Sequence, residues 1–280
     1  MKRYKPTTKS RRNMTGIHYA AIVTTQTPEK SLTHGFKRAV GRNNSGIITT
    51  RHKGTGHKRM YRDVDFRYEK ISIPYTLMTV EYDPNRSGFI GLVQYKDGEK
   101  RYILLPQTVR PGEIFINDEK ADIKAGNRLP LKAIPVGTFV YNVEVKPLGG
   151  AKLARSAGNF IEVVAKDAGM VDLKMPSSEV RKVKETAWAS VGSVSNDENR
   201  LVNLGKAGRS RWLGIRPTVR GTAQNPVDHP HGGGEGRQGR GRRRAISVYG
   251  KPTGKGQKSR TPKKYSNKYI VSRRKVGKKK

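Results

Sequence analysis

The uneven placement of charge constrains this chain more than any other feature of its sequence. Its 280 residues carry 58 Lys and Arg against 22 Asp and Glu, a formal net charge of +36. Residues 1–60 hold 14 basic and one acidic residue, and residues 201–280 hold 23 basic and two acidic residues. Residues 61–130 hold 11 of each sign, and residues 131–200 hold 10 basic and eight acidic residues. The sequence therefore predicts a near-neutral folded body between two polycationic extensions that order on a polyanion.

Composition excludes several classes of protein. The chain has no Cys, so a disulfide scaffold, a thiolate zinc site and a cysteine nucleophile are all excluded. No apolar run approaches the ~20 residues of a membrane span. Residues 1–12 are basic without an apolar stretch behind them, which is unlike a secretory signal, although an organellar transit peptide stays open. Nucleic acid is the leading candidate for the polyanion, and an anionic membrane surface is the second.

Alternating apolar residues predict β-strands in the body of the chain. A strand with one buried face shows a period of two residues. We also expect one short helical turn within residues 177–185. Two strands have these predicted buried faces: Phe139, Tyr141, Val143 and Val145 in one, and Met78, Val80 and Tyr82 in the other.

Turn signals divide the body into hairpins. A Gly- and Pro-rich stretch, residues 126–135, separates two sets of strands. Short strands with turns about every ten residues favour two small barrels over a parallel sheet. The predicted hairpins are residues 89–95 with 101–105 around Asp97-Gly98, and residues 160–165 with 170–175 around Asp167-Ala168-Gly169.

Motifs that suggest enzymes lack the context their chemistry needs. Residues 234–239 match G-x-G-x-x-G, but Arg242-Arg243-Arg244 follow where a helix would be needed. Residues 231–234 resemble the oxyanion loop of some esterases, yet the chain has no G-x-S-x-G elbow. Residues 250–259 hint at a phosphate loop without completing it, so we expect their amides and lysines to contact RNA phosphate. A basic hydrolase that uses His229 stays open as an alternative function.

Two Gly-rich basic stretches favour RNA contact instead. Residues 51–59 interleave Arg, Lys, His and Gly, and residues 205–260 are dense in Gly, Arg, Lys and Pro. Glycine lets the backbone approach a crowded surface, Arg binds phosphate through two donors, and His, Tyr and Trp stack on bases. A zinc site that joins His229 and His231 to His52 or His57 is a weaker alternative, because no Cys or carboxylate cluster stands beside them.

Long strings of the sequence resemble the universal large-subunit ribosomal protein L-two family, in its bacterial form, over nearly the whole chain. The longest is RPTVRGTAQNPVDHPHGGGEGR at residues 216–237. The chain departs from the family pattern at Tyr141, where His is common, at Gln224, where Met is usual, at residues 186–190, and at Lys255-Gly256, which looks like an insertion. The other matching strings are TTRHKGTGHKR (49–59), EYDPNR (81–86), DGEKRYI (97–103), PVGTFVYNVEVKP (135–147), LARSAG (153–158) and GKAGRSRW (205–212).

The resemblance implies a mainly β fold, with an OB-fold barrel followed by a Src-homology-3-like barrel and long basic N- and C-terminal extensions. The implied divisions are a basic N-terminal extension (1–60), an OB-fold RNA-binding domain (61–125), a Src-homology-3-like barrel (126–200) and a basic Gly/Arg-rich C-terminal extension (201–280).

The resemblance also implies a function without catalysis by the protein itself. Family members are primary rRNA-binding proteins that support subunit association, tRNA binding and peptide-bond formation near the RNA peptidyl-transferase centre. The implied partners are large-subunit rRNA, small-subunit rRNA through an intersubunit bridge, neighbouring ribosomal proteins and, indirectly, tRNA. We expect a monomer within the ribosome, in the cytoplasm rather than an organelle, with no membrane partner. No metal or protein cofactor is expected, since Mg2+ would accompany the rRNA.

His229 matches a family histidine whose part in peptidyl transfer is disputed, and we take it as a contact or organising residue. An architectural DNA-binding protein is the main alternative, because it would share the charge and the extensions. The expected RNA-binding residues are Arg51, His52, Lys53, Gly54, His57, Lys58, Arg59, Arg62, Arg67, Arg86, Arg155, Lys206, Arg209, Arg211, Trp212, Arg216, Arg220, Asn225, Asp228, His229, His231, Gly232, Gly233, Gly234, Arg237, Arg242, Arg243 and Arg244.

Overall fold

The computed structural model describes residues 1–38, 40–254 and 260–274. Half of the phosphate-loop hint at residues 250–259, and the whole Lys255-Gly256 insertion, therefore lie outside the described residues. The chain forms two compact units. Unit 1 contains Met1–Arg38, Lys58–Lys206 and the described part of Lys268–Lys280, and unit 2 contains the described parts of Ala39–His57 and Ala207–Asn267. No helix among the described residues is long and apolar enough to cross a bilayer.

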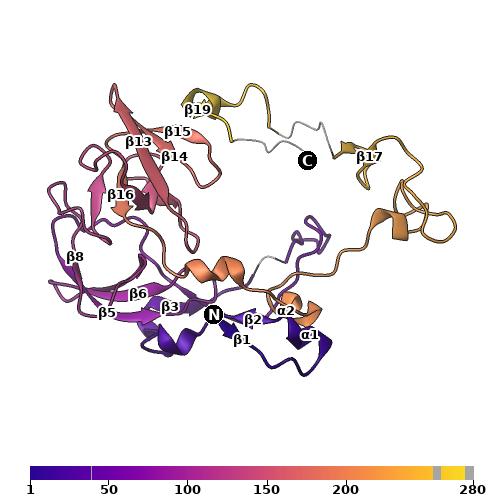
Figure 1. Ribbon diagram of the computed structural model, residues 1–280, viewed down its shortest axis with the longest axis horizontal. Helices are drawn as coiled ribbons and strands as arrows, with labels where there is room; N and C mark the ends of the chain where they lie inside the picture. The colour runs from indigo at the N-terminus through magenta and orange to yellow at the C-terminus, as the bar shows by residue number, and fades with distance from the viewer. Residues whose placement is uncertain (39, 255–259, 275–280) are drawn as a thin grey trace. The chain divides into compact units, whose positions relative to one another are not determined.

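Unit 1 is mainly β and holds two large antiparallel sheets besides short strand pairs, which confirms the predicted fold class (Figure 1). The first sheet is an OB-like half-barrel whose strand order is β7-β6-β5-β8. Its core includes Leu77, Val93 and Phe115, all of which are fully buried. The strands of this first sheet are β5 (Tyr75–Glu81), β6 (Ile90–Tyr95), β7 (Lys100–Leu104) and β8 (Ile114–Phe115).

The second sheet has seven strands in the order β19-β15-β14-β13-β10-β16-β9. Its core is built from aliphatic residues, including Leu131, Val163 and Leu173. Strand β19 belongs to the C-terminal segment and pairs with β15 at one edge of the sheet. The strands of this second sheet are β9 (Arg128–Pro130), β10 (Phe139–Tyr141), β13 (Ile161–Asp167), β14 (Met170–Lys174), β15 (Val180–Lys184), β16 (Trp188–Val191) and β19 (Ile270–Ser272).

The remaining elements are short and connect or flank the sheets. The paired strands are β1 (Lys2–Arg3) with β2 (Thr15–Gly16), β3 (Thr33–Gly35) with β4 (Met60–Arg62), β11 (Val143–Glu144) with β12 (Ala151–Leu153), and β17 (Ala245–Ile246) with β18 (Pro252–Thr253). The helices are α1 (Lys9–Arg12), α2 (Ala207–Trp212) and the 3-10 turns η1 (Tyr19–Ala21), η2 (Lys30–Leu32), η3 (Asp197–Leu201), η4 (Gly221–Ala223) and η5 (Tyr265–Tyr269).

Both hairpins predicted from the sequence are confirmed. Strands β6 and β7 pair antiparallel across the Asp97-Gly98 turn, where Gly98 has a φ of +87°. Strands β13 and β14 pair with Asp167 opposite Met170, so that the loop between them has two residues. Ala168 and Gly169 both have positive φ, at +47° and +74°, as a type I′ turn requires.

The helical turn expected within residues 177–185 is wrong, because this segment contains strand β15. Val180 and Val183 stand three residues apart, which imitates the spacing of a helix face. Pairing with β14 along the whole strand, and with β19 at Val180 and Arg181, supplies backbone hydrogen bonds in the extended state. Tertiary pairing therefore overrides the local pattern.

Both predicted buried faces are wrong in part. The register of β5 shifts between Leu77 and Thr79, and this irregularity turns Met78 outward while Val80 stays buried. Tyr82 is also exposed. In the other strand Asn142 adopts a left-handed φ of +50° and ends β10, so the period of two residues fails there.

Val140 and Tyr141 of strand β10 lie on opposite faces of the strand, and both are buried. Phe139 is exposed, whereas Val140 packs into the core of the second sheet. Tyr141 packs against Leu104 of the first sheet and donates a hydrogen bond to the Leu104 carbonyl, 3.4 Å away. The residue that departs from the family pattern at position 141 is thus buried where the two sheets meet.

A buried polar network crosses this junction. The Arg128 guanidinium donates to a carboxylate oxygen of Glu144 at 3.0 Å and to the carbonyl of Asn142 at 2.8 Å. It also lies 4.5 Å from the ring centroid of Tyr68, whose hydroxyl accepts a hydrogen bond from the Asn142 amide. Burial raises the pKa of Tyr68 to about 12, so the phenol is neutral. This network joins the two β-sheets within unit 1.

Candidate nucleic-acid interface

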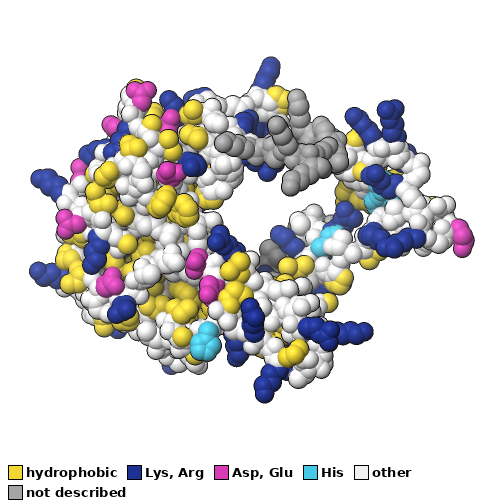
Figure 2. All heavy atoms as spheres, in the orientation of Figure 1, with side chains coloured by type: hydrophobic (Ala, Val, Ile, Leu, Met, Phe, Trp, Pro, Cys, Tyr) yellow, Lys and Arg dark blue, Asp and Glu magenta, His cyan; other side chains and the backbone are white. Residues whose placement is uncertain are grey.

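Unit 2 concentrates uncompensated positive charge. The residues assigned to it include 18 Lys and Arg but only two carboxylates, Asp228 and Glu235. Two carboxylates cannot neutralise 18 cations, whatever the positions of their side chains. Lys and Arg side chains project from much of the surface in Figure 2, whereas Asp and Glu are few. Unit 2 therefore presents the polycationic surface that a polyanion needs.

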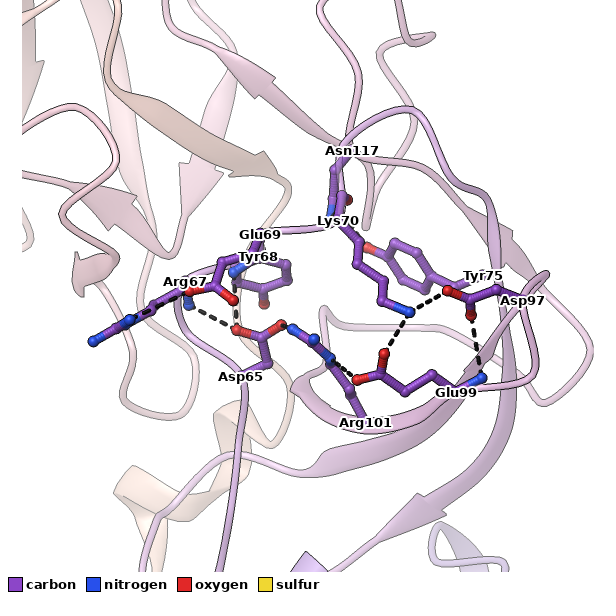
Figure 3. A network of polar contacts seen from close by, with 10 residues as sticks. All are labelled: Asp65, Arg67, Tyr68, Glu69, Lys70, Tyr75, Asp97, Glu99, Arg101 and Asn117. Atoms are coloured by element: carbon purple, nitrogen blue, oxygen red, sulfur yellow. Dashed lines mark hydrogen bonds and ion pairs between the residues drawn. The ribbon is translucent and has the colours of Figure 1, made fainter.

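The first sheet of unit 1 neutralises its own cations instead (Figure 3). Arg101 contacts Asp65 at 2.8 Å and Glu99 at 2.6 Å, and Lys70 forms ion pairs with Glu99 and Asp97. The main cause that raises the pKa of Lys70 is its hydrogen bond to Asp97, and the same bond lowers the pKa of the Asp97 carboxyl. The equal numbers of basic and acidic residues in 61–130 are therefore accompanied by ion pairs between them on the surface.

Two segments that are far apart in the sequence lie side by side in unit 2. Lys53 and Ile215 form an antiparallel bridge. The Gly54 amide donates to the Gly214 carbonyl at 2.8 Å, and the Arg216 amide donates to the His52 carbonyl at 3.0 Å. The pairing brings together the candidate residues of both Gly-rich basic stretches. We call residues 51–57 and 212–216 the paired basic strip.

An aromatic pair lies at one end of the paired basic strip. The His57 amide donates to the Trp212 carbonyl at 2.9 Å, and the two rings meet edge to face with centroids 6.5 Å apart. Trp212 ends helix α2, which also carries Arg209 and Arg211. Its side chain is 53% exposed although indole is largely apolar. Exposed aromatic rings among arginines are typical of surfaces on which nucleobases stack.

The loop that contains Asp228-His229-Pro230-His231 is held by its own backbone. The Asp228 amide donates to the Asn225 carbonyl at 3.0 Å, and the Gly232 amide donates to the His229 carbonyl at 2.8 Å. A Cβ at Gly232 would lie 2.2 Å from the Asn225 carbonyl oxygen, so no side chain fits at this position. The glycines of this loop allow the chain to fold tightly on itself, as well as to approach a partner.

The two histidines of this loop act as hydrogen-bond acceptors. His229 Nδ1 accepts from the His231 amide at 3.0 Å, and His231 Nε2 accepts from the Ile246 amide at 3.1 Å. Burial lowers the pKa of His231, and its electrostatic interactions with His229, Arg240 and Arg242 lower it further. An accepting ring nitrogen carries no proton, so each neutral ring presents its proton on the other nitrogen.

This geometry bears on the role expected for His229. Its Nδ1 is already engaged, which leaves Nε2 as a donor rather than as a general base. The ring also packs on Gly221, where a Cβ would lie 2.5 Å from His229 Cε1. His229 is therefore placed to shape the loop and to donate one hydrogen bond. Among the described residues, no group of three or more His, Asp or Glu is arranged to hold a metal ion.

Seven of the expected RNA-binding residues lie in unit 1, and several are engaged within the protein. Arg62 is buried, and Arg67 contacts Glu69 at 3.3 Å. Arg86 pairs with the fully buried Asp83, and Arg155 lies 4.5 Å from the ring centroid of Phe66. The members of this unit 1 group are Lys58, Arg59, Arg62, Arg67, Arg86, Arg155 and Lys206.

The remaining candidates lie in unit 2, and most are exposed. The paired basic strip and the histidine loop each gather several of them. They are Arg51, His52, Lys53, Gly54, His57, Arg209, Arg211, Trp212, Arg216, Arg220, Asn225, Asp228, His229, His231, Gly232, Gly233, Gly234, Arg237, Arg242, Arg243 and Arg244.

Two exposed tyrosines of unit 2 were not among the expected RNA-binding residues. Tyr249 is 78% exposed and Tyr265 is 81% exposed, the latter beside Lys263 and Lys264. A phenol ring left in solvent beside lysines is a candidate stacking residue. Each of these tyrosines stands in a basic stretch of the sequence with few apolar residues, and this pattern could have identified both as candidates.

A β-rich body with a polycationic unit defines the chain as a nucleic-acid-binding protein. Residues 29–117 match the family described as Ribosomal Proteins L2, RNA binding N-terminal domain, and residues 124–250 match Ribosomal Proteins L2, C-terminal domain. The chain belongs to the ribosomal protein L2 family, which confirms the resemblance seen in the sequence. It is a structural protein that binds RNA and associates with the ribosome.

Proposed function

We propose that the chain is a primary rRNA-binding protein of the large ribosomal subunit. The observation that carries the proposal is unit 2, where 18 basic residues stand against two acidic ones. In this proposal unit 2 lies against rRNA and neutralises phosphates where RNA helices pack together. The expected RNA-binding residues of both units act through phosphate contacts and stacking.

The β-sheets then serve as a folded platform for these contacts. We propose an OB-fold RNA-binding domain over residues 61–125 and a Src-homology-3-like barrel over residues 126–200. Residues 1–60 and 201–280 are the basic extensions. The polar junction centred on Arg128 supports the proposal, because it holds two sheets together and so presents their surfaces to RNA in one arrangement.

The proposal includes support for subunit association, tRNA binding and peptide-bond formation, with the chemistry left to RNA. His229 supports such an organising role, since its Nδ1 accepts a backbone hydrogen bond and its ring packs on Gly221. The proposed partners are large-subunit rRNA, small-subunit rRNA across a bridge, and neighbouring ribosomal proteins. The proposed state is a monomer within a cytoplasmic ribosome.

Ultraviolet crosslinking in cell lysate, followed by sequencing of the attached RNA, tests this function. We expect large-subunit rRNA to dominate the attached sequences. A competition assay separates the proposal from an architectural DNA-binding role: structured rRNA should displace bound rRNA fragments far better than double-stranded DNA does. Equal or better competition by DNA would favour the DNA-binding role and overturn the proposal.

A variant of His229 tests the organising role. His229→Ala should leave the urea-unfolding midpoint of the β-sheets unchanged, because the residue lies in unit 2. Ribosomes assembled with this variant should translate more slowly. An unchanged rate would show that the residue is dispensable. Ester hydrolysis by the free chain that depends on His229 would instead indicate an enzyme.

A further inference from the structure

The β3–β4 pair in unit 1 carries an aromatic cluster that the proposed function does not use. His34 lies directly opposite Tyr61 in the register, with ring centroids 5.2 Å apart. Phe36 follows two residues after His34 and meets the Tyr61 ring edge to face, with centroids 5.5 Å apart. Three rings therefore form a row with Tyr61 at its centre. We call His34, Phe36 and Tyr61 the aromatic platform.

The other face of this strand pair is turned inward. Thr33 lies opposite Arg62, which is buried, whereas His34, Phe36 and Met60 are exposed. Strand residues alternate between faces, so the rings are presented outward because Thr33 and Arg62 face inward. Phe36 is 39% exposed, which leaves its apolar surface open to a partner.

The charged residues around the aromatic platform differ between the two ends of the strand pair, with cations at one end and a carboxylate at the other. Lys37 and Arg38 follow Phe36, and Lys58 and Arg59 precede Met60, so four cations flank the same end. Asp63 lies at the opposite end, where its carboxylate is 3.4 Å from His34 Nδ1. Burial lowers the pKa of Arg38, and the positive charge of Arg59 lowers it further, so these two guanidinium groups lie close enough to repel each other. Four cations at one end supply the positive charge that favours a phosphate group there.

We propose that the aromatic platform binds a splayed-out nucleotide of single-stranded rRNA, with its base on the ring row and its phosphate at the Arg38 and Arg59 end. This inference rests on the proposed function and adds to it a binding site for an unpaired nucleotide. Rings beside cations match a base joined to a phosphate, whereas a protein partner would have to bring acidic residues to the same end.

Photocrosslinking of the full chain to purified large-subunit rRNA tests the site directly. Trypsin releases residues 31–37, SLTHGFK, which contain two of the rings. We expect mass spectrometry to find this peptide carrying a nucleotide adduct after irradiation at ultraviolet wavelengths and nuclease digestion. Its absence, in a sample where peptides of unit 2 carry adducts, overturns the platform and leaves the proposed function standing. Absence of all adducts would count against both.

Binding measurements on variants give an independent readout. Tyr61→Leu and Phe36→Leu should each weaken rRNA binding about tenfold without changing the salt dependence, because stacking is uncharged. Tyr61→Phe should bind as the unaltered chain does. Arg38→Gln should lower the salt dependence by about one phosphate contact.

The matched control is Phe160→Leu, which removes an exposed ring that packs on Phe139 beside the Lys174–Glu162 ion pair. It should leave binding unchanged. Because Phe36 is exposed, Phe36→Leu should stay folded. This variant can therefore test the site even if Tyr61→Leu unfolds. Unaltered affinity of Phe36→Leu and Tyr61→Leu, with both variants folded, overturns the site and would assign the platform to a protein partner.

Discussion

Single residues hold the junction between the two β-sheets of unit 1. Arg128 and Glu144 are both almost fully buried, and each has hydrogen-bond partners besides the other. A buried ion pair contributes little beyond what well-packed apolar residues would, but removal of one partner leaves a charge without compensation. The individual side chains of this junction therefore matter more than the pair does as a whole.

Removal of one charge of this pair should destabilise the protein strongly. Arg128→Met should lower the free energy of unfolding by about 3–5 kcal/mol, because Glu144 stays buried without its partner. Urea titration measures the change. The double variant Arg128→Met, Glu144→Met should lose less unfolding free energy than the single variant Arg128→Met does.

An exposed pair supplies the control for that experiment. Lys132 contacts Glu119 at 2.8 Å, with both side chains about half exposed. Lys132→Met should cost less than about 1 kcal/mol. Equal losses for Arg128→Met and Lys132→Met would show that burial of the ion pair has no consequence for stability.

Acidification should loosen the histidine loop. The pKa of His231 in the folded protein is lowered from its usual value near 6.5, so folding favours the neutral ring. Its stabilising effect is complete above about pH 6.5 and is lost as the pH falls through the lowered folded-state pKa. Protonation removes the acceptor for the Ile246 amide, and hydrogen exchange at that amide, corrected for intrinsic rates, should speed up at acidic pH.

A variant without a titratable group checks this assignment. His231→Gln keeps a side-chain acceptor but does not titrate near neutral pH. Corrected exchange at Ile246 should then lose its dependence on pH in this range. The same pH dependence in His231→Gln would assign the effect to another group.

At the scale of elements, local sequence predicts hairpins well, but it predicts poorly which residues of a strand are buried. The Asp97-Gly98 and Ala168-Gly169 turns were predictable because their chemistry is contained in two adjacent residues. The strand at β15 was not, because its extended state depends on β14 and β19, which the local sequence does not reveal. A register shift in β5 and a left-handed Asn142 each interrupt a period that pattern analysis assumes to be regular.

The β13–β14 turn offers a prediction for an element. Ala168 has a φ of +47°, a conformation that costs an L-residue with a Cβ about 1 kcal/mol. Ala168→Asn should raise the free energy of unfolding by about 0.5–1 kcal/mol, because type I′ turns favour Asn at this position. Urea titration measures it, and a loss of stability would contradict the assigned turn. Gly169→Ala, at φ +74°, should be destabilising and serves as the opposing control.

The candidate site was predictable in composition but not in arrangement. Residue types alone indicated which stretches of the chain would contact nucleic acid. The pairing of Lys53 with Ile215 joins segments about 160 residues apart, and neither segment carries a signal for the other. The aromatic platform needed the β3–β4 register, because Phe36 and Tyr61 are distant in sequence.

At the scale of the whole molecule, the near-balanced β-sheets differ in charge from the rest of the chain. Residues 61–200 hold 21 basic and 19 acidic residues, while unit 2 has 18 cations for two carboxylates and residues 1–38 have nine cations for one. Electrostatic binding to RNA should therefore come from unit 2 and from the basic N-terminal part of unit 1. The β-sheets can fold without RNA, because their cores are buried and their surface charge is largely balanced.

Salt should weaken rRNA binding steeply. Each phosphate neutralised in single-stranded RNA contributes about −0.7 to the slope of log K against log salt concentration, so about ten to twenty contacts give a slope of order −10. Filter binding over a salt series measures it. A variant with Arg242, Arg243 and Arg244 changed to Gln should show a slope shallower by about two. A slope near zero for the unaltered chain would contradict a phosphate-based mechanism.

Strand β19 has a topological consequence for unit 2. Residues 207–267 leave unit 1 after Lys206 and return to it before β19 pairs with β15. This stretch is therefore a closed loop rather than a free tail. A free tail can enter a narrow RNA channel end first, but a loop fastened at both ends cannot. RNA must either fold around the loop after it is in place, or wait for the three residues of β19 to detach and let the end pass through.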